Sequence, residues 1–137
     1  MDKALNYLGL ARKAGFAELG EEPVGAAARA QHARIILVAS DASDHTWRRA
    51  QSFAAGTEQF CLKVPYSKDQ LGQAIGRSAL AVAAITDPAL ALAFVKALEQ
   101  PAAHKTILES LEKRTKRVQQ RQKEAKNHKK NVRFGKK

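Results

Sequence analysis

Hydrophobic positions along the first hundred residues follow two different periods. Short continuous runs of aliphatic and β-branched residues predict strands that are buried on both faces. These runs, with a shorter extended segment ahead of them, cover residues 16–19, 34–39, 59–64 and 80–85. Between the runs, apolar residues recur every three or four positions, which predicts helices. The predicted helices cover residues 4–14, 21–30, 45–55, 68–75 and 89–98.

Residues that begin or end helices stand at several of these boundaries. Glycine readily adopts the backbone that ends a helix, and Gly15, Gly56 and Gly76 each follow a helical stretch. The acids and proline of residues 21–23 suit a first turn, because acids complement its exposed amides. Since helices and strands alternate through short connections, we predict an α/β sandwich with one sheet between helix layers, without a second folded domain.

The charge of the chain is concentrated in its C-terminal part. The whole chain carries a formal net charge of +11. Residues 1–100 hold 11 Lys and Arg against 10 Asp and Glu, whereas residues 101–137 hold 13 against 3. We therefore predict a nearly neutral domain over residues 1–100 and a basic tail over residues 101–137. The expected partner of such a tail is a polyanion, with nucleic acid favoured over an anionic membrane.

The tail begins with a helical pattern and then loses it. Ile107, Leu108 and Leu111 share one helical face, and Val118 lies two turns further along. Residues 121–137 are rich in Lys, Arg and Gln, and they offer too little apolar surface to offset the entropy of ordering. We expect this last segment to be mobile in the free protein.

Several functional classes are disfavoured by what the chain lacks. The chain has a single cysteine, Cys61, so an internal disulfide is excluded. Because Cys61 lies in an apolar run, we interpret it as a core residue. No segment reaches the about 18 apolar residues of a membrane span, and no secretory signal follows the N-terminus, which favours a cytoplasmic location. The histidines lack ligand spacing, and no phosphate-binding loop or nucleophile turn is present, so we predict no metal, no cofactor and no enzymatic activity.

Five segments, in order and at family spacing, resemble the L7Ae/L30e ribosomal-protein family, and within it the bacterial YlxQ-like branch. The segments are residues 8–15 (LGLARKAG), 20–22 (GEE), 37–43 (LVASDAS), 71–76 (LGQAIG) and 86–88 (TDP). The resemblance covers about residues 4–98 and leaves the tail outside it. It implies a three-layer α-β-α sandwich with a four-stranded mixed sheet. It also implies binding to structured RNA of the kink-turn type. We expect a monomer whose partner is ribosomal RNA or the ribosome.

The resemblance also implies an RNA-binding face made of three separate segments. The first is Gly20-Glu21-Glu22-Pro23 with the helix after it, the second is residues 40–43, and the third is residues 77–80. A helix N-terminus offers amides to phosphate oxygens, carboxylates accept from guanine, and arginine neutralises phosphate or stacks on a base. The candidate RNA-binding residues are Gly20, Glu21, Glu22, Arg29, Ser40, Asp41, Ala42, Arg77, Ser78 and Ala79.

The first segment departs from the pattern of kink-turn binders. Those proteins usually carry Asn-Glu after the glycine and a small residue, followed by a lysine one turn later. This chain has Glu22, Pro23 and Ala26 at these positions. An asparagine can donate a hydrogen bond and a glutamate cannot, and the phosphate contact of the lysine is missing. Arg29 is the candidate substitute for that lysine.

Simpler explanations exist for the same residues. Glu21 and Glu22 also fit as first-turn acids that complement a helix dipole, and Asp41 and Ser43 fit as caps of the helix that begins near residue 45. Trp47, beside two arginines, suggests a stacking platform for RNA, but we favour packing of part of its ring in the core.

Two other functions compete with RNA recognition by the folded domain. The first is a protein-interaction adaptor in ribosome or translation-related assemblies. It docks through residues 89–98 or 107–118, while the tail binds RNA without sequence preference. The second is a weak membrane-surface protein, which the shortage of bulky apolar residues in the tail disfavours.

Overall fold

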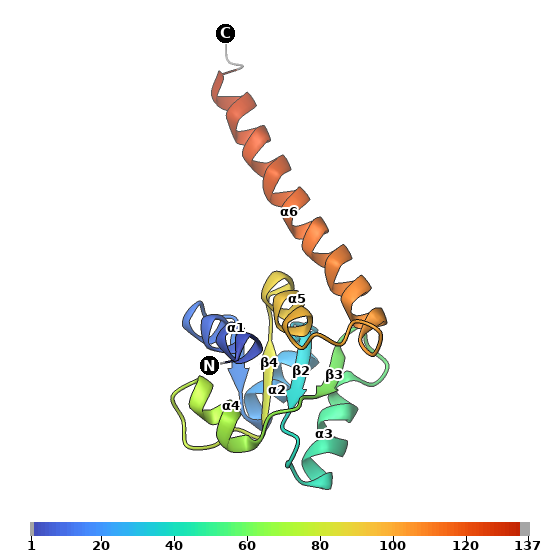
Figure 1. The fold of residues 1–137 in the computed structure, drawn as a ribbon. Helices are drawn as coiled ribbons and strands as arrows, with labels where there is room; N and C mark the ends of the chain where they lie inside the picture. The colour runs from blue at the N-terminus through green and yellow to red at the C-terminus, as the bar shows by residue number, and fades with distance from the viewer. Residues whose placement is uncertain (1, 135–137) are drawn as a thin grey trace.

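A four-stranded mixed sheet forms the centre of the molecule, in a computed structural model that describes the backbone of residues 2–134 and the side chains of residues 2–123 (Figure 1). The strands are β1 (Ala17–Leu19), β2 (Ile35–Val38), β3 (Phe60–Lys63) and β4 (Val82–Ile85). They lie in the order β1-β4-β2-β3. The β2–β3 pair is parallel, whereas β4 is antiparallel to both β1 and β2. The mixed sheet of four strands is therefore confirmed.

Helices cover both faces of this sheet, which confirms the three-layer sandwich (Figure 1). One layer contains α1, α4, α5 and the start of α6, and the other contains α2 and α3. The helices are α1 (Lys3–Lys13), α2 (Glu21–Arg29), α3 (Asp44–Ala54), α4 (Lys68–Ala74), α5 (Pro88–Ala97) and α6 (Lys105–Phe134). No helix in the described part of the chain is long and apolar enough to cross a membrane.

The central strand β2 explains the continuous hydrophobic run in the sequence. Ile35 and Leu37 pack into the larger core, on the side of α1 and α5, whereas Ile36 and Val38 pack into the smaller core under α2 and α3. All four side chains are fully buried. A strand buried on both faces has no polar alternation, because neither face meets water.

Polar side chains cap helix starts that the sequence predicted, and the structure shows one further cap that was not predicted. The Ser67 hydroxyl accepts from the Gln70 amide at 3.1 Å, and the Gln70 side chain accepts in return from the Ser67 amide at 2.9 Å. This reciprocal pair is a capping box. The additional cap is Asp2, whose Oδ1 accepts from the Ala4 amide at 2.9 Å and from the Tyr66 hydroxyl at 2.7 Å. Burial and this second bond both raise the pKa of Tyr66.

The last helix differs from the sequence-based expectation in two respects. Leu111 is fully buried in the larger core, so the first turns of α6 pack as part of the folded domain. The helix then continues to Phe134, although we expected a mobile segment from residue 121 onward. Residues 105–134 contain no glycine or proline, and their Lys, Arg, Gln and Glu residues favour helix, which accounts for the continuation.

Cys61 lies on the edge strand β3, where its half-buried side chain packs against the smaller core. Burial raises the pKa of its thiol to about 12. An unfolded cysteine has a pKa near 8.5, so the thiol contributes stability that is fully present below about pH 8.5 and is lost as the pH rises toward 12.

The protection of Cys61 is directly testable by alkylation. At pH 8, iodoacetamide is expected to react with Cys61 at least about a hundredfold more slowly in the folded protein than in urea, because the thiolate is the nucleophile and the raised pKa makes it scarce. Mass spectrometry of quenched time points measures both rates. Equal rates in the two conditions would show that the thiol is not protected by the fold.

Candidate nucleic-acid interface

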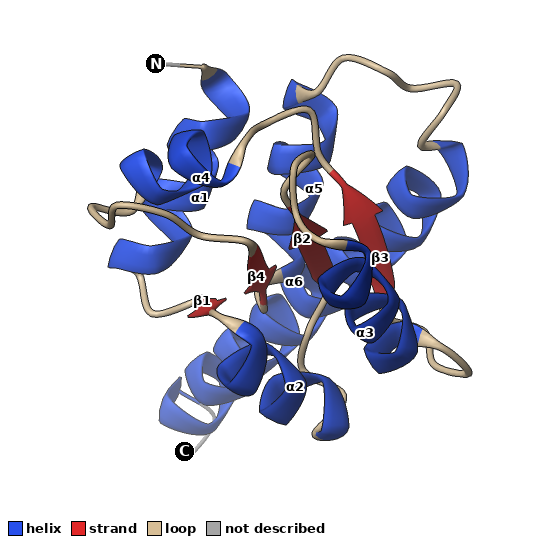
Figure 2. Cartoon of the chain, turned by 90° about the horizontal axis from the view of Figure 1, so that it is seen from below, coloured by secondary structure: helices blue, strands red, loops and turns tan. Residues whose placement is uncertain are grey.

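The three predicted RNA-binding segments come together at one end of the sheet. The Gly20 amide donates to the Val82 carbonyl at 3.0 Å, and the Ala39 amide donates to the Ala81 carbonyl at 2.9 Å. Because β4 is antiparallel to both β1 and β2, the start of β4 lies beside the ends of these two strands. Figure 2, a view of the molecule from below, looks onto this end. We call the surface formed by residues 20–23, 40–43 and 77–80 the loop face.

The N-terminus of α2 is the first part of the loop face. Gly20 precedes the helix with a φ of 97°, a backbone conformation that glycine adopts without strain. No described side chain caps the helix, so the amides of Glu21 and Glu22 stay available for an acceptor, whereas Pro23 has no N–H to offer. The Glu22 side chain is exposed, and the half-buried Glu21 lies 3.8 Å from the Nε of Arg49.

A shallow depression runs from this helix start toward α3. It has a volume of about 500 Å³, and two acids and two arginines face it. The residues that line it are Glu21, Glu22, Pro23, Ala26, Arg29 and Arg49. Two cations thus line the same depression as Ala26, the position at which a kink-turn binder usually carries its lysine. Arg49 was not among the predicted RNA-binding residues, because only the packing of α3 against α2 brings it here.

The second segment, residues 40–43, connects the loop face to α4. Asp41 Oδ1 accepts from the Lys68 amide at 2.8 Å, and the Ser40 amide donates to the Tyr66 carbonyl at 2.8 Å. The prediction that Ser43 caps α3 is therefore confirmed, since its hydroxyl accepts from the Thr46 amide. The same prediction is wrong for Asp41, which accepts from an amide at the start of α4 instead. Ser40 and Asp41 are exposed, while Ala42 is half-buried.

The third segment follows α4 and depends on a glycine within that helix. Arg77, Ser78 and Ala79 are exposed, and the Arg77 amide donates to the Gly72 carbonyl at 2.8 Å. A Cβ on Gly72 would lie 2.7 Å from the backbone N and Cα of Ala79 and 2.9 Å from the Arg77 carbonyl oxygen. Gly72 therefore permits the loop to pack directly on the helix. It belongs to the segment that resembles the family, although we did not select it as a site residue.

Trp47 packs as the core explanation predicts. Its half-buried ring lies against the smaller core, and the Lys63 ammonium lies 5.0 Å from the ring centroid. Among the residues whose side chains are described, no three His, Cys, Asp or Glu residues are grouped closely enough to hold a metal ion. The chemistry of the loop face is thus that of free amides, carboxylates and guanidinium groups, which suits recognition of a polar, charged surface.

Comparison with known proteins places the chain in a family. No family model matches it. It is 36% identical over 75 residues to the RNA-binding protein YlxQ of Enterococcus faecium. The aligned region covers 55% of this chain and 72% of that relative. A Bacillus halodurans protein of unknown function has a TM-score of 0.68 at 25% identity, over 73% of this chain and 100% of that one. The Giardia lamblia 15.5 kD RNA binding protein has a TM-score of 0.60 at 18% identity, over 74% of this chain and 86% of its own. The chain therefore belongs to the YlxQ branch of the L7Ae/L30e family.

Proposed function

We propose that this protein binds structured RNA of the kink-turn type through the loop face, without catalysing a reaction. The observation that carries the proposal is the meeting of three distant segments at one end of the sheet, with an uncapped helix start beside Arg29 and Arg49. The names of two related proteins support it, since YlxQ of E. faecium and the Giardia protein are both RNA-binding proteins.

Each group of the loop face has a defined part in this proposal. The amides of Glu21 and Glu22 donate to phosphate or base oxygens, because a helix N-terminus favours negative charge. The exposed Glu22 carboxylate accepts from the N–H groups of a guanine in a distorted helix. Arg29 and Arg49 neutralise the phosphates on either side and replace the lysine that position 26 lacks.

The third segment contributes a further cation to the loop face. Arg77 is exposed and follows the bend of the chain after Gly76, so its guanidinium can neutralise a phosphate or stack on an unpaired base. We extend the proposal to a cytoplasmic monomer whose target is ribosomal RNA, on the strength of the family resemblance.

The adaptor alternative has less support than RNA recognition. Its two docking helices were residues 89–98 and 107–118, which correspond to α5 and the first part of α6. In the structure α5 packs between α1 and α6, so these two surfaces largely cover each other (Figure 1). A partner protein would have to separate them before it could dock.

The RNA proposal is tested with a double variant of the depression. Arg29→Gln with Arg49→Gln is expected to lower the slope of log affinity against log salt concentration by about 2, since two phosphate contacts are lost. Filter binding or fluorescence anisotropy with a kink-turn RNA measures this slope between low and moderate salt.

A matched variant separates local contacts from overall charge. Arg12→Gln with Lys13→Gln removes the same charge from exposed positions of α1 and is expected to change the slope less. A kink-turn RNA and an uninterrupted duplex of equal length test the specificity of the wild-type protein. Equal affinity for both RNAs would refute the kink-turn preference, and binding of neither RNA at low salt would refute RNA binding altogether.

A further inference from the structure

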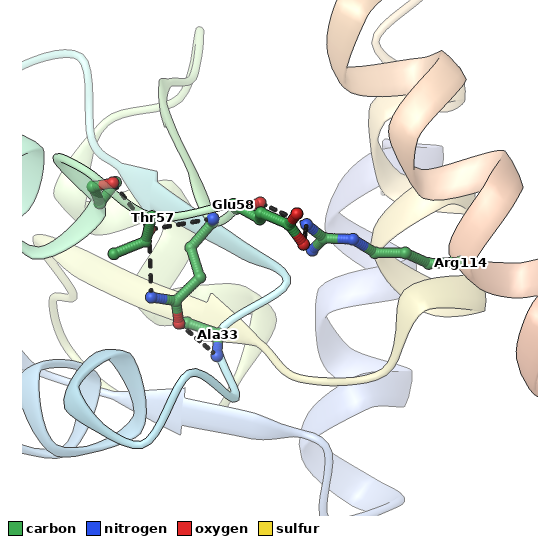
Figure 3. A network of polar contacts seen from close by, with 6 residues as sticks. Ala33, Thr57, Glu58 and Arg114 are labelled. Atoms are coloured by element: carbon green, nitrogen blue, oxygen red, sulfur yellow. Dashed lines mark hydrogen bonds and ion pairs between the residues drawn. The ribbon is translucent and has the colours of Figure 1, made fainter.

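A second basic surface lies at the end of the sheet opposite the loop face. β2 and β3 are parallel, so the residues just before them, Arg34 and Glu58, share the end where these strands begin. The helix α6 joins the domain here and projects away from the loop face (Figure 1). Figure 3 shows Arg114 reaching from α6 to Glu58, where its Nη2 donates to the backbone carbonyl and lies 3.4 Å from the carboxylate.

Several cations line two adjoining hollows at this end. Arg34 and Arg114 line a hollow of about 430 Å³ beside the turn that precedes β3. Arg114 also lines a neighbouring hollow of about 270 Å³, together with the adjacent Lys113 and with Arg117, which follows about one turn later in α6. Glu58 borders both hollows and is the only acid on their walls within the described part of the chain. We call Arg34, Lys113, Arg114 and Arg117 the arginine end.

These charges are poorly compensated within the folded protein. The Nε of Arg34 is buried and has no hydrogen-bond acceptor among the described residues. The Arg114 side chain is 13% exposed, whereas its acidic partner Glu58 is 92% exposed and therefore well screened by water. Burial lowers the pKa of the Arg114 guanidinium, and the positive charges of Arg34 and Arg117 lower it further, against the raising effect of Glu58. A bound anion would relieve this repulsion.

We propose that the arginine end binds a phosphate of an RNA backbone, as a second RNA contact separate from the loop face. Only the naming of RNA as the source of this phosphate rests on the proposed function. The exposed residues of α6 that follow, from Lys116 to Lys123, are polar or basic apart from the half-buried Val118. They extend the cationic surface, and they offer too little apolar surface for insertion into a membrane.

The placement of the two surfaces decides how RNA is held. A helix of the length of α6 extends about 45 Å, at 1.5 Å per residue, and it points away from the loop face. A short RNA bound at the loop face therefore does not run along α6. The protein instead holds two RNA segments, one at each end of the sheet.

The test is a bridging experiment with the full chain. A kink-turn RNA is immobilised and saturated with protein, and the capture of a second, fluorescently labelled RNA duplex is measured. Arg34→Gln with Arg117→Gln is expected to leave the affinity for the kink-turn within about twofold and to reduce capture of the duplex by roughly tenfold or more, because charge-assisted hydrogen bonds are lost. Arg114 is left intact, since it connects α6 to the turn before β3.

Three controls make each outcome decisive. Arg117→Gln alone, at an exposed position, leaves the fold intact and is expected to reduce capture severalfold. Arg12→Gln with Lys13→Gln removes equal charge elsewhere and is expected to leave capture close to wild type. Vesicles that contain phosphatidylserine replace the duplex in a third arm, and they are expected not to be captured.

The proposal is overturned if both arginine-end variants capture the duplex as well as the wild-type protein does, or if the wild-type protein captures no duplex. It is also overturned if vesicles are captured in a way that depends on the same arginines. These failures differ from failure of the loop-face proposal. If the kink-turn RNA binds and the duplex is not captured, the second contact is absent and the loop-face function stands. If plain duplex binding depends on Arg34 and Arg117 while no kink-turn preference exists, the second contact stands and the loop-face function is wrong.

Discussion

Leu111→Ala is expected to lower the free energy of unfolding by about 2–5 kcal/mol, the range for truncation of a fully buried leucine. Leu111 comes from the segment that its composition marks as a basic tail, yet it packs into the larger core beside α5. Loss of its side chain removes contacts that join α6 to the larger core.

Urea unfolding followed by circular dichroism measures this loss. Lys113→Ala, two residues along the same helix and exposed, is the control and is expected to change stability by less than about 0.5 kcal/mol. Truncation after residue 118 is expected to leave the fold intact, whereas truncation after residue 100 removes core side chains and destabilises the domain. A stable, cooperatively folding fragment of residues 1–100 would show that α6 contributes nothing to the core.

Gly72→Ala is expected to destabilise the protein by about 1–3 kcal/mol and to weaken binding to a kink-turn RNA. Alanine in place of glycine within a helix normally stabilises by about 0.5–1 kcal/mol. Here the added Cβ would lie 2.7 Å from backbone atoms of Ala79, which cannot rotate away as a flexible side chain can. The overpacking cost is therefore the larger effect, and its relief displaces the loop that carries Arg77.

Two measurements distinguish the loop displacement from a loss of helix. Amide chemical shifts are expected to change most at residues 77–79, and RNA affinity is to be measured well below the unfolding midpoint so that only folded protein contributes. Gln73→Ala, the adjacent exposed position, is the control and is expected to preserve both stability and RNA affinity. A Gly72→Ala protein of equal or greater stability would contradict the close approach of the loop to α4.

The elements that the sequence predicted well are those with a local cause. Ile35 to Val38 form a continuous apolar run because the strand is buried on both faces, and Ser67 and Gln70 lie within one helical turn of each other. In both cases a few neighbouring residues of the sequence are enough to recognise the element, either from the apolar run or from the two side chains that form the cap. The four-stranded mixed sheet was predicted from the family resemblance rather than from these patterns, and the order of its strands was not predicted.

The features that escaped prediction depend on residues far apart in the sequence. Asp41 caps a helix that begins 27 residues later, and Arg49 reaches the α2 depression only because α3 packs against α2. The arginine end joins Arg34, which lies just before β2, to residues of α6 that are far away in the sequence. The sequence predicted the apolar helical face that contains Leu111, but it gave no indication of the core against which that face packs.

The strand order also determines how the sheet behaves toward other copies of itself. Its two outer strands are β1, with three residues, and β3, which ends at the exposed Lys63 and carries Phe60 under the guanidinium of Arg114. Open strand borders invite intermolecular pairing, and shortness or a charged side chain discourages it. The shortness of β1, the charge of Lys63 and the cover of Arg114 thus protect the domain against edge-to-edge aggregation. Because Arg114 is also proposed to bind RNA, neutralising it carries a risk of self-association.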